Sequence, residues 1–309
     1  MTSSPRHKVL VIVGPTASGK SELALRLAME LDGEIVNADS MQVYRGMDIG
    51  TAKPDPQQRL TVPHHLIDVA APDHPFSAAD YAESAALAVS DIASRGKRPI
   101  VVGGTGLYIR ALLNGLVDSP SGAGEIRQKL QDEARQLGNA AMLERLRRVD
   151  PDAAARMHPN NLVRIIRALE VHELTGAPLS RHQQRHGFSD SRFEARRIGI
   201  QVERSVLYRR IEERVEHMLT AGLLDEVRGL LAAGCDRSLK SMRAIGYKEA
   251  AAFLYGECSH ADMVDLIKRD TRRYAKRQLT WFRGESDIIW LEYPEKFVSI
   301  LEHAIDFFG

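Results

Sequence analysis

Short apolar runs alternate with amphipathic segments through the first third of the chain. Four runs have the length and composition of buried strands, namely residues 8–13 (KVLVIV), 33–38 (GEIVNA), 65–69 (HLIDV) and 98–104 (RPIVVGG). Residues 18–31 place leucines at helical spacing, and residues 77–94 begin with a serine cap and continue in Ala-rich sequence. This alternation is typical of parallel strands joined by crossover helices. We therefore predict an α/β core built on a parallel sheet.

The pattern changes beyond Leu116. From about residue 124 to residue 185 the sequence offers no strand candidate, only helical stretches punctuated by proline and glycine. A strand-like run returns at residues 197–203, and helices follow, apart from a short apolar run at residues 287–292. We predict a core of residues 1–118 and 196–309, interrupted by an all-helical insertion domain of residues 119–195.

Composition and charge limit the class of protein. The 309 residues are 44% hydrophobic and 27% charged, which is enough for one large or two modest packed domains. Because the formal net charge is +1, attraction to nucleic acid must come from local clusters of charge. Cys235 and Cys258 are too few for a disulfide framework and have no partner at metal-ligand spacing. No apolar stretch approaches the roughly 20 residues that span a bilayer, so we expect a cytoplasmic protein without a membrane segment.

The first strand leads into GPTASGKS, a full match to the pattern G-x-x-x-x-G-K-[ST]. Glycines there allow backbone N–H groups to point at phosphate oxygens, and the helix that follows adds its positive dipole end. Lys20 would reach the terminal phosphate, and the Ser21 hydroxyl would ligate Mg²⁺. The core is therefore predicted to be P-loop NTPase-like. The residues expected to hold phosphate are Gly14, Pro15, Thr16, Ala17, Ser18, Gly19, Lys20 and Ser21.

Two further strands end in candidate site residues. In doubly wound sheets the carboxyl ends of the strands form the ligand crevice, so Asp39 is expected to face the phosphate loop from a neighbouring strand. There it would ligate Mg²⁺ or act as a general base, although a turn cap explains a lone Asp equally well. Gly103, Gly104 and Gly106 surround Thr105, whose hydroxyl would lie in the crevice or cap the next helix. The sequence lacks an ATPase-type DE pair and a guanine-reading signature, so hydrolytic equipment is missing.

A basic segment near the end of the chain is a candidate nucleic-acid surface. Seven cations have only Asp270 in opposition: Lys268, Arg269, Arg272, Arg273, Lys276, Arg277 and Arg283. Positions 269, 272, 273 and 276 have helical spacing and form a stripe, with Tyr274, Trp281 and Phe282 interleaved. Cationic side chains suit contacts to a nucleic-acid backbone, and aromatic side chains suit stacking on its bases. The alternative is a helix whose charged face is simply solvated and whose aromatic residues belong to the core.

Several stretches together resemble one family, the tRNA dimethylallyltransferases, also called tRNA isopentenyltransferases. They are GPTASGKS, DSMQVYRGMDIGTAKP, PHHLIDV, FSAADYAESA, VVGGTGLYIRALL, DPDAAARMHPNNLVRIIRALEV, SMRAIGYKEA and AKRQLTWFRG, in family order along nearly the whole chain. The second and the last are highly specific. SPSGAGEIR departs from the family pattern, and the zinc-finger extension of some eukaryotic members is missing, so the resemblance is to a bacterial-type enzyme.

The resemblance implies transfer of a dimethylallyl group from dimethylallyl diphosphate to N6 of the adenosine 3′-adjacent to the anticodon, with release of diphosphate. It implies Mg²⁺ as cofactor, the anticodon stem-loop of tRNA as partner, and a chain that we expect to be monomeric. The catalytic residues it implies are Asp39 as the base, Thr16, Lys20, Thr105 and Arg214, with Arg210 as the alternative to Arg214. The target adenine would have to be flipped out of its stack.

The resemblance also implies a set of tRNA contacts. They are Asp39, Ser40, Met41, Gln42, Thr105, Arg127, Val163, Arg164, Ile165, Ile166, Arg167, Arg243, Lys248, Lys276, Arg277, Gln278, Leu279, Thr280, Trp281, Phe282 and Arg283. The phosphate loop and Asp39 alone would also fit a small-molecule or nucleotide kinase. A non-catalytic tRNA-binding module with a vestigial loop is a third hypothesis.

Overall fold

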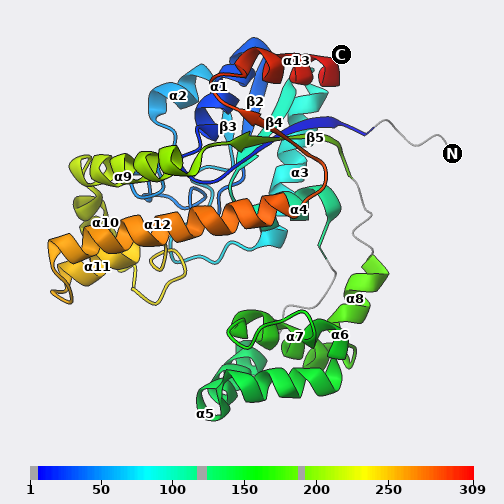
Figure 1. Cartoon of the computed structure of the whole chain (residues 1–309), viewed down its shortest axis with the longest axis vertical. Helices are drawn as coiled ribbons and strands as arrows, with labels where there is room; N and C mark the ends of the chain where they lie inside the picture. Colours follow the sequence, from blue (N-terminus) through cyan, green and yellow to red (C-terminus); the bar gives the residue numbers. More distant parts are fainter. Residues whose placement is uncertain (1–5, 117–123, 187–191) are drawn as a thin grey trace. The chain divides into compact units, whose positions relative to one another are not determined.

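The computed structural model describes residues 6–116, 124–186 and 192–309 (Figure 1). It divides the chain into one unit of Met1–Leu113 with Arg192–Gly309 and a second unit of Asn114–Ser191. Both boundaries lie a few residues before the ones predicted at 118/119 and 195/196. Helix α4 (Gly106–Asn114) ends the first segment of the core, and strand β5 (Glu194–Gln201) begins inside the predicted insertion.

Six parallel strands form the sheet of the first unit, as the sequence predicted. Their bounds are β1 (Lys8–Val13), β2 (Gly33–Asn37), β3 (His64–His65), β4 (Arg98–Gly103), β5 (Glu194–Gln201) and β6 (Ile288–Glu292). The strand order is β3-β2-β4-β1-β5-β6. In this register Leu10 of β1 pairs with Ile100 of β4 on one side and with Arg196 of β5 on the other. Because the strands run in one direction, their carboxyl ends share one edge, where sheets of this kind hold ligands.

Strand β3 is shorter than the apolar run at residues 65–69 predicted. Only His64 and His65 pair with β2. Leu66 and Asp68 have φ of 63° and 58°, a left-handed conformation that a strand cannot contain. The run therefore turns, and the Asn37 side chain holds the turn by donating to the Leu66 carbonyl at 3.2 Å.

Helices cover both faces of the sheet. Alternation along β1 sends Val9 and Val11 to one face and Leu10 and Ile12 to the other, so each face has its own core. Helices α3 (Ala78–Ser94) and α4 pack on the first face, and α1 (Lys20–Glu30) and α13 (Phe297–Phe308) pack on the second. The predicted serine cap of α3 is confirmed, because the Ser77 hydroxyl accepts from the N–H groups of its first turn.

Four helices of the carboxyl-terminal part gather beside the carboxyl edge of the sheet (Figure 1). They are α9 (Arg204–Thr220), α10 (Leu223–Ala232), α11 (Tyr247–Leu254) and α12 (His260–Arg283), and a short helix, α2 (Pro56–Thr61), follows the β2 loop. Helix α12 packs against both α9 and α11. It therefore carries one face toward the core and one toward solvent.

The second unit is helical in its described residues, as predicted. It contains α5 (Gly124–Val149), α6 (Pro151–Ala154), α7 (Leu162–Thr175) and α8 (Leu179–His186). Helix α5 is broken at Gly138, whose φ is 81°. The buried Asp150 carboxylate caps α6 through Ala153 N–H and accepts from Ser180 N–H at 2.9 Å, which ties α6 to α8. Across the parts of the chain described, every helix is too short or too polar to cross a membrane.

Candidate active site

A cavity lies at the carboxyl edge of the sheet, where the phosphate loop meets the ends of β2 and β4. Its lining includes Thr16, Lys20, Ser21, Asp39, Gln42 and Arg214. The predicted loop, the predicted base and one of the two candidate arginines are therefore brought together, although they come from positions far apart in the sequence. The cavity contains a carboxylate, two cations and several hydroxyl and amide groups, which is a donor set for a phosphorylated ligand.

The phosphate loop adopts the tight turns that its glycines predict. Gly19 has φ of 91° and Ala17 has φ of 63°, so α1 starts at Lys20 and not at Ser18 as the pattern suggested. At Gly14 a Cβ atom would lie 2.8 Å from the Ser18 hydroxyl, which excludes a side chain there. The Ser18 hydroxyl is buried and, among the described residues, meets no hydrogen-bond partner.

Lys20 is held back under the loop, where its ammonium donates to the Pro15 carbonyl at 3.3 Å. Burial lowers the pKa of Lys20 to about 8; the Asp39 carboxylate opposes this shift and the Arg214 guanidinium adds to it. The three groups are thus close enough to interact electrostatically within one cavity. The fraction of Lys20 that is protonated therefore depends on the charges inside the cavity.

Asp39 lines the cavity from the end of β2, as the sequence suggested, but β2 is not the strand next to the phosphate loop. β4 lies between β2 and β1, so Asp39 and the phosphate loop do not come from neighbouring strands. Its Oδ1 accepts from Met41 N–H at 2.8 Å and Gln42 N–H at 3.4 Å. Asp39 is therefore both a turn cap and a cavity residue, and the turn uses only one of its two carboxylate oxygens.

Thr105 locks the ends of β2 and β4 together. Its hydroxyl accepts from Ser40 N–H at 3.0 Å, and its own N–H donates to the Ala38 carbonyl at 3.2 Å. The strands approach so closely that a Cβ atom on Gly103 would lie 2.1 Å from the Ala38 oxygen. Thr105 precedes α4, as predicted, but its hydroxyl binds the Asp39 loop.

Arg214 is the arginine that reaches the cavity from α9, and Arg210 is not part of the lining. The Arg214 Nη2 donates to the Thr51 carbonyl at 3.3 Å. Burial lowers the pKa of its guanidinium, and Asp39 opposes that effect. Gln42 also donates to the Thr51 carbonyl, at 3.1 Å, so both side chains depend on where this carbonyl lies.

Two residues that the sequence reasoning missed fix the loop containing Thr51. The Glu226 carboxylate on α10 accepts from three consecutive N–H groups, those of Asp48, Ile49 and Gly50, at 2.8, 2.7 and 3.1 Å. Tyr247 donates to the same carboxylate at 2.6 Å, and its ring lies so close that a Cβ atom on Gly50 would meet it at 2.5 Å. The sequence signals were MDIGTAKP and, for Tyr247, SMRAIGYKEA, but neither indicates that Glu226 of α10 would bind this loop.

The exposed basic stripe of α12 differs from the predicted one, because Arg277 takes the place of Arg272. Lys268 and Arg272 turn toward α9, where they pair with Glu216 at 2.5 Å and Glu212 at 2.9 Å. The stripe that remains at the surface consists of Arg269, Arg273, Lys276 and Arg277. Asp270 lies beneath its first half and pairs with Arg269 and, at 3.5 Å, with Arg273.

Several residues expected to contact tRNA have side chains that are buried in the core of their own unit. Phe282 is 2% exposed in the core of the first unit, and Ile165 and Ile166 are 0% and 5% exposed in the core of the second. Gln278 is 5% exposed, and Leu279 packs against Leu207 and Ile211. Trp281 is partly buried beneath the Arg110 guanidinium, which lies 4.4 Å from its ring. The motif is helical as expected, but a packed helix turns inward the residues that recur every three or four positions, here Ala275, Gln278 and Phe282.

The remaining expected contacts lie at the surface or in ion pairs. Val163, Arg164, Arg243, Thr280 and Arg283 are exposed. Arg127 and Arg167 both donate to the buried Glu170 carboxylate, at 2.7 and 2.9 Å. Lys248 pairs with Asp270 at 3.0 Å and with Glu249 at 3.2 Å.

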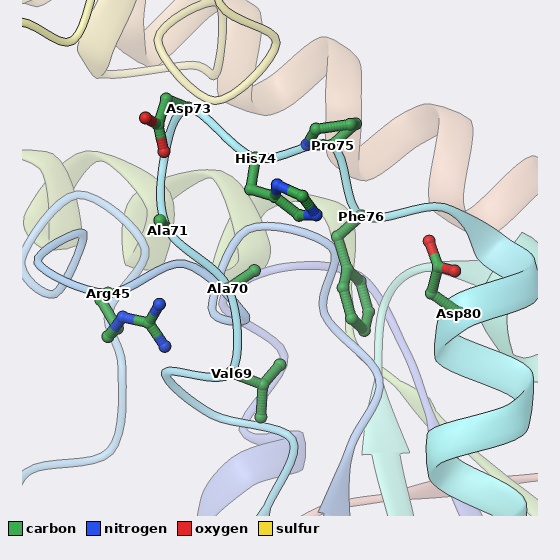
Figure 2. Close-up of a pocket in the computed structure, with 9 residues that line it drawn as sticks. All are labelled: Arg45, Val69, Ala70, Ala71, Asp73, His74, Pro75, Phe76 and Asp80. Atoms are coloured by element: carbon green, nitrogen blue, oxygen red, sulfur yellow. The ribbon is translucent and has the colours of Figure 1, made fainter.

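A second hollow of about 430 Å³ lies apart from the phosphate loop (Figure 2). Its wall comes from Arg45, from the segment between β3 and α3, including His74 and Phe76, and from Asp80 in the first turn of α3. Figure 2 shows these side chains along one open rim, with the Phe76 ring inward of Asp80. It contains no residue of the phosphate loop, so chemistry rather than size identifies the candidate active site.

The parallel sheet, the loop after β1 and the cationic cavity define a P-loop-like α/β protein whose cavity combines two cations with a carboxylate. The family model described as IPP transferase matches residues 42–285. The chain belongs to this family, that of the tRNA dimethylallyltransferases, which confirms the resemblance seen in the sequence.

Known relatives match the chain over nearly its full length. A protein named tRNA dimethylallyltransferase 1, from Pelobacter propionicus, is 67% identical over 308 residues, which cover 100% of each chain. The solved structure of the full-length tRNA isopentenylpyrophosphate transferase from Bacillus halodurans is 40% identical, covers 98% of this chain and 97% of its own, and has a TM-score of 0.73. A solved eukaryotic dimethylallyltransferase acting on tRNA is 29% identical, with 97% and 80% coverage and a TM-score of 0.80.

Proposed function

We propose that the chain transfers the dimethylallyl group of dimethylallyl diphosphate to N6 of the adenosine 3′-adjacent to the anticodon in tRNA, and releases diphosphate. The observation that carries this proposal is the single cavity that Asp39 shares with Lys20 and Arg214 at the phosphate loop. A base beside an anion-binding loop suits a reaction in which an amine loses a proton while a diphosphate leaves. The family and the names of the relatives support the same reaction.

In this reaction the bond between the allylic carbon and the diphosphate oxygen breaks, and that carbon bonds to N6. Negative charge grows on the leaving diphosphate, which the loop N–H groups at the start of α1 would stabilise together with Lys20 and Arg214. The loop then holds a leaving group and performs no phosphoryl transfer.

The proton of the adenine amine goes to Asp39 in our proposal. The lone pair of this amine is delocalised into the ring, so losing the proton as the N–C bond forms makes attack easier. Asp39 has one oxygen committed to its turn and faces the cations that would hold the donor. Thr105 and Ser40 fix the turn, and Thr16 lies at the donor end of the cavity.

Mg²⁺ fits the residues of the cavity as a partner of the diphosphate. Mg²⁺ prefers oxygen ligands and keeps waters and substrate phosphates among them, and the Ser21 hydroxyl and Asp39 carboxylate are oxygen donors of the cavity. Within the described residues, no three His, Cys, Asp or Glu side chains are grouped to hold a metal, so Ser21 and the substrate would supply the ligands. When bound, the ion would offset charge on the leaving diphosphate.

The proposed tRNA surface of the first unit is the exposed stripe of α12, joined by Arg243. Arg273, Lys276 and Arg277 present charge to solvent and suit contacts to RNA phosphates. In the second unit, Arg164 at the start of α7 is exposed and suits the same role. We also propose that the chain works as a monomer in the cytoplasm; its mass in solution with and without tRNA would test the first point.

The experiment that tests this function uses labelled dimethylallyl diphosphate and an unmodified anticodon stem-loop. We expect label in the RNA and release of diphosphate. A stem-loop with guanosine in place of the target adenosine is the control, because it lacks the N6 amine. Transfer to neither RNA, together with ATP-dependent phosphorylation of a small acceptor, would replace this proposal with the kinase hypothesis.

Asp39→Asn tests the proposed base. The amide keeps an oxygen for the Met41 N–H, so the turn should survive while proton transfer is lost. We expect the rate of transfer to fall by about 10²–10⁴-fold with little change in the affinity for the stem-loop. Asp306→Asn, on the exposed side of α13, is the matched control. An unchanged rate in Asp39→Asn would remove Asp39 from the mechanism.

A further inference from the structure

Gln278 occupies an unusual place in α12, between the phosphate loop and the end of β4. Its Oε1 accepts from Thr16 N–H at 2.8 Å, across 262 residues of sequence, and its Nε2 donates to the Gly104 carbonyl at 2.9 Å. With the side chain only 5% exposed, both halves of the amide are used inside the protein. Gln278 therefore uses one acceptor and one donor of its amide inside the protein, and its burial keeps the amide from reading an RNA base.

The end of β4 is shaped around this side chain. A Cβ atom on Gly104 would lie 2.0 Å from the Gln278 Nε2 and 3.1 Å from its Cδ. Two residues further on, a Cβ atom on Gly106 would lie 2.1 Å from the Nε1 atom of Trp281, which is also in α12. Gly104 and Gly106 thus make room for α12.

We propose that Gln278 is a positioning residue for the diphosphate donor, acting through the phosphate loop; this rests on the proposed function. Thr16 begins the part of the loop that turns through Ala17 and Gly19 into α1, so the place of its N–H sets where the following N–H groups point. Gln278 ties this point to the strand end that carries Thr105.

Losing the amide would leave the Thr16 N–H and the Gly104 carbonyl unpaired in a part-buried place, which costs free energy unless the loop shifts. The loop would then bind diphosphate less well, although no group that touches diphosphate has changed. The same helix carries Arg273 and Lys276 on its exposed side, so one helix would serve the donor and the RNA with different faces.

The first experiment compares Gln278→Met with Gln57→Met, an exposed glutamine of α2. Methionine keeps the length of the side chain and removes both hydrogen bonds. We expect the dissociation constant for inorganic diphosphate with Mg²⁺ to rise about ten-fold, which is about 1.4 kcal/mol. The affinity for the anticodon stem-loop should stay the same, and the control should change neither.

The second experiment uses Gly104→Ala, alone and combined with Gln278→Ala. Alone, Gly104→Ala should expel the Gln278 amide and weaken diphosphate binding as Gln278→Met does. In the Gln278→Ala background the added methyl has room, so Gly104→Ala should cost little more. This non-additivity is a signature that a general loss of fold stability would not produce.

Two outcomes would overturn the proposal. If Gln278→Met weakens stem-loop binding and leaves diphosphate binding intact, Gln278 contacts RNA. Three results together would show that Gln278 is only part of the core. Binding of both ligands would weaken equally, the melting temperature would fall, and the effects of Gly104→Ala and of the Gln278 substitution on diphosphate binding would be additive. Failure of the proposed function is seen separately, as a wild-type protein that binds diphosphate but transfers no label to RNA.

Discussion

Lys20 shows how a single residue takes its chemistry from its surroundings. Burial lowers the pKa of its ammonium from 10.5 to about 8, Asp39 raises it in part and Arg214 lowers it further. The protonated form is the one that attracts a diphosphate. Binding of an anion favours that form, so it should raise the pKa of Lys20 in the complex.

The affinity for diphosphate should therefore depend on pH above neutrality. Below pH 8 the free protein already carries the Lys20 charge; above pH 8 binding must take up a proton, so affinity falls as pH rises. Titration of inorganic diphosphate between about pH 6.5 and 9.5 would measure this. Lys20→Met should bind more weakly at low pH and lose that part of the pH dependence. An equal pH dependence in the variant would assign the titration to another group.

For single residues, the sequence predicted which residues line the site better than it predicted which residues they contact. The loop pattern identified Lys20 because its spacing is local, and the cavity does contain it. Gln278 was expected to touch RNA, and its burial could not be seen because Thr16 lies 262 residues away. The burial of Phe282 was missed for a similar reason, since basic neighbours in the motif conceal which face of the helix is packed.

At the scale of the element, α12 divides its cations between the protein and solvent. Arg272 is paired with Glu212 on α9, whereas Arg273 and Lys276 are exposed. Replacing Arg273 and Lys276 together by Ala should weaken stem-loop binding and reduce the slope of log K against log salt by roughly 1.5, because two phosphate contacts are lost. Binding measured at several salt concentrations would test this.

Arg272→Ala is the contrast on the same helix. Its guanidinium lies 2.9 Å from the Glu212 carboxylate and its side chain is 30% exposed, against 63% for Arg273, so we expect a smaller change in the salt slope than for either exposed cation. Diphosphate binding should be unchanged when Arg273 and Lys276 are both replaced by Ala. If Arg272→Ala reduces the salt slope more than the exposed-cation variants do, the face of α12 that pairs with α9 is the one that contacts RNA.

The loop at residues 48–53 depends on an element distant in sequence. Glu226 of α10 collects three backbone N–H groups and the Tyr247 hydroxyl, and the loop in turn presents the Thr51 carbonyl to Arg214. Glu226→Ala should lower the free energy of unfolding by about 1–3 kcal/mol, because the N–H groups lose their acceptor. It should also weaken diphosphate binding, because Arg214 loses its fixed partner.

Urea unfolding and diphosphate titration of the same variant would separate these two effects. Tyr247→Phe removes one donor and keeps the carboxylate, so both effects should be smaller. Glu257→Ala, which breaks an exposed pair with Arg237, is a suitable control. If Glu226→Ala is destabilised but binds diphosphate normally, the loop does not position Arg214.

For the whole molecule, hydrophobic patterning predicted the sheet and the helical insertion because each depends on local periodicity. Strand neighbours did not follow from it: β4 lies between β2 and β1, and nothing in the runs themselves specifies that order. The division into units followed from the loss of strand candidates, and its edges moved once β5 formed from residues that look polar. Long-range pairing, rather than local preference, decides such edges.

The two units have separate cores, so damage to one should leave the chemistry of the other intact. Ile165 is fully buried among Leu130, Leu146 and Leu169 of the second unit, whereas the cavity belongs to the first. Ile165→Ala should lower the stability of the second unit by about 2–5 kcal/mol through the cavity it creates. Hydrogen exchange should then rise in α5 and α7 but not in the sheet, and diphosphate binding should not change.

Stem-loop binding gives the informative readout for this variant. The buried Glu170 carboxylate of α7 accepts hydrogen bonds from both Arg127 and Arg167. If α7 is destabilised, these two guanidinium groups should lose their fixed positions, and the affinity for RNA should fall. Leu137→Ala, at an exposed position of α5, should alter neither exchange nor affinity. If Ile165→Ala instead increases exchange in the sheet and weakens diphosphate binding, the two units share stability, and the phosphate loop depends on the insertion for its shape.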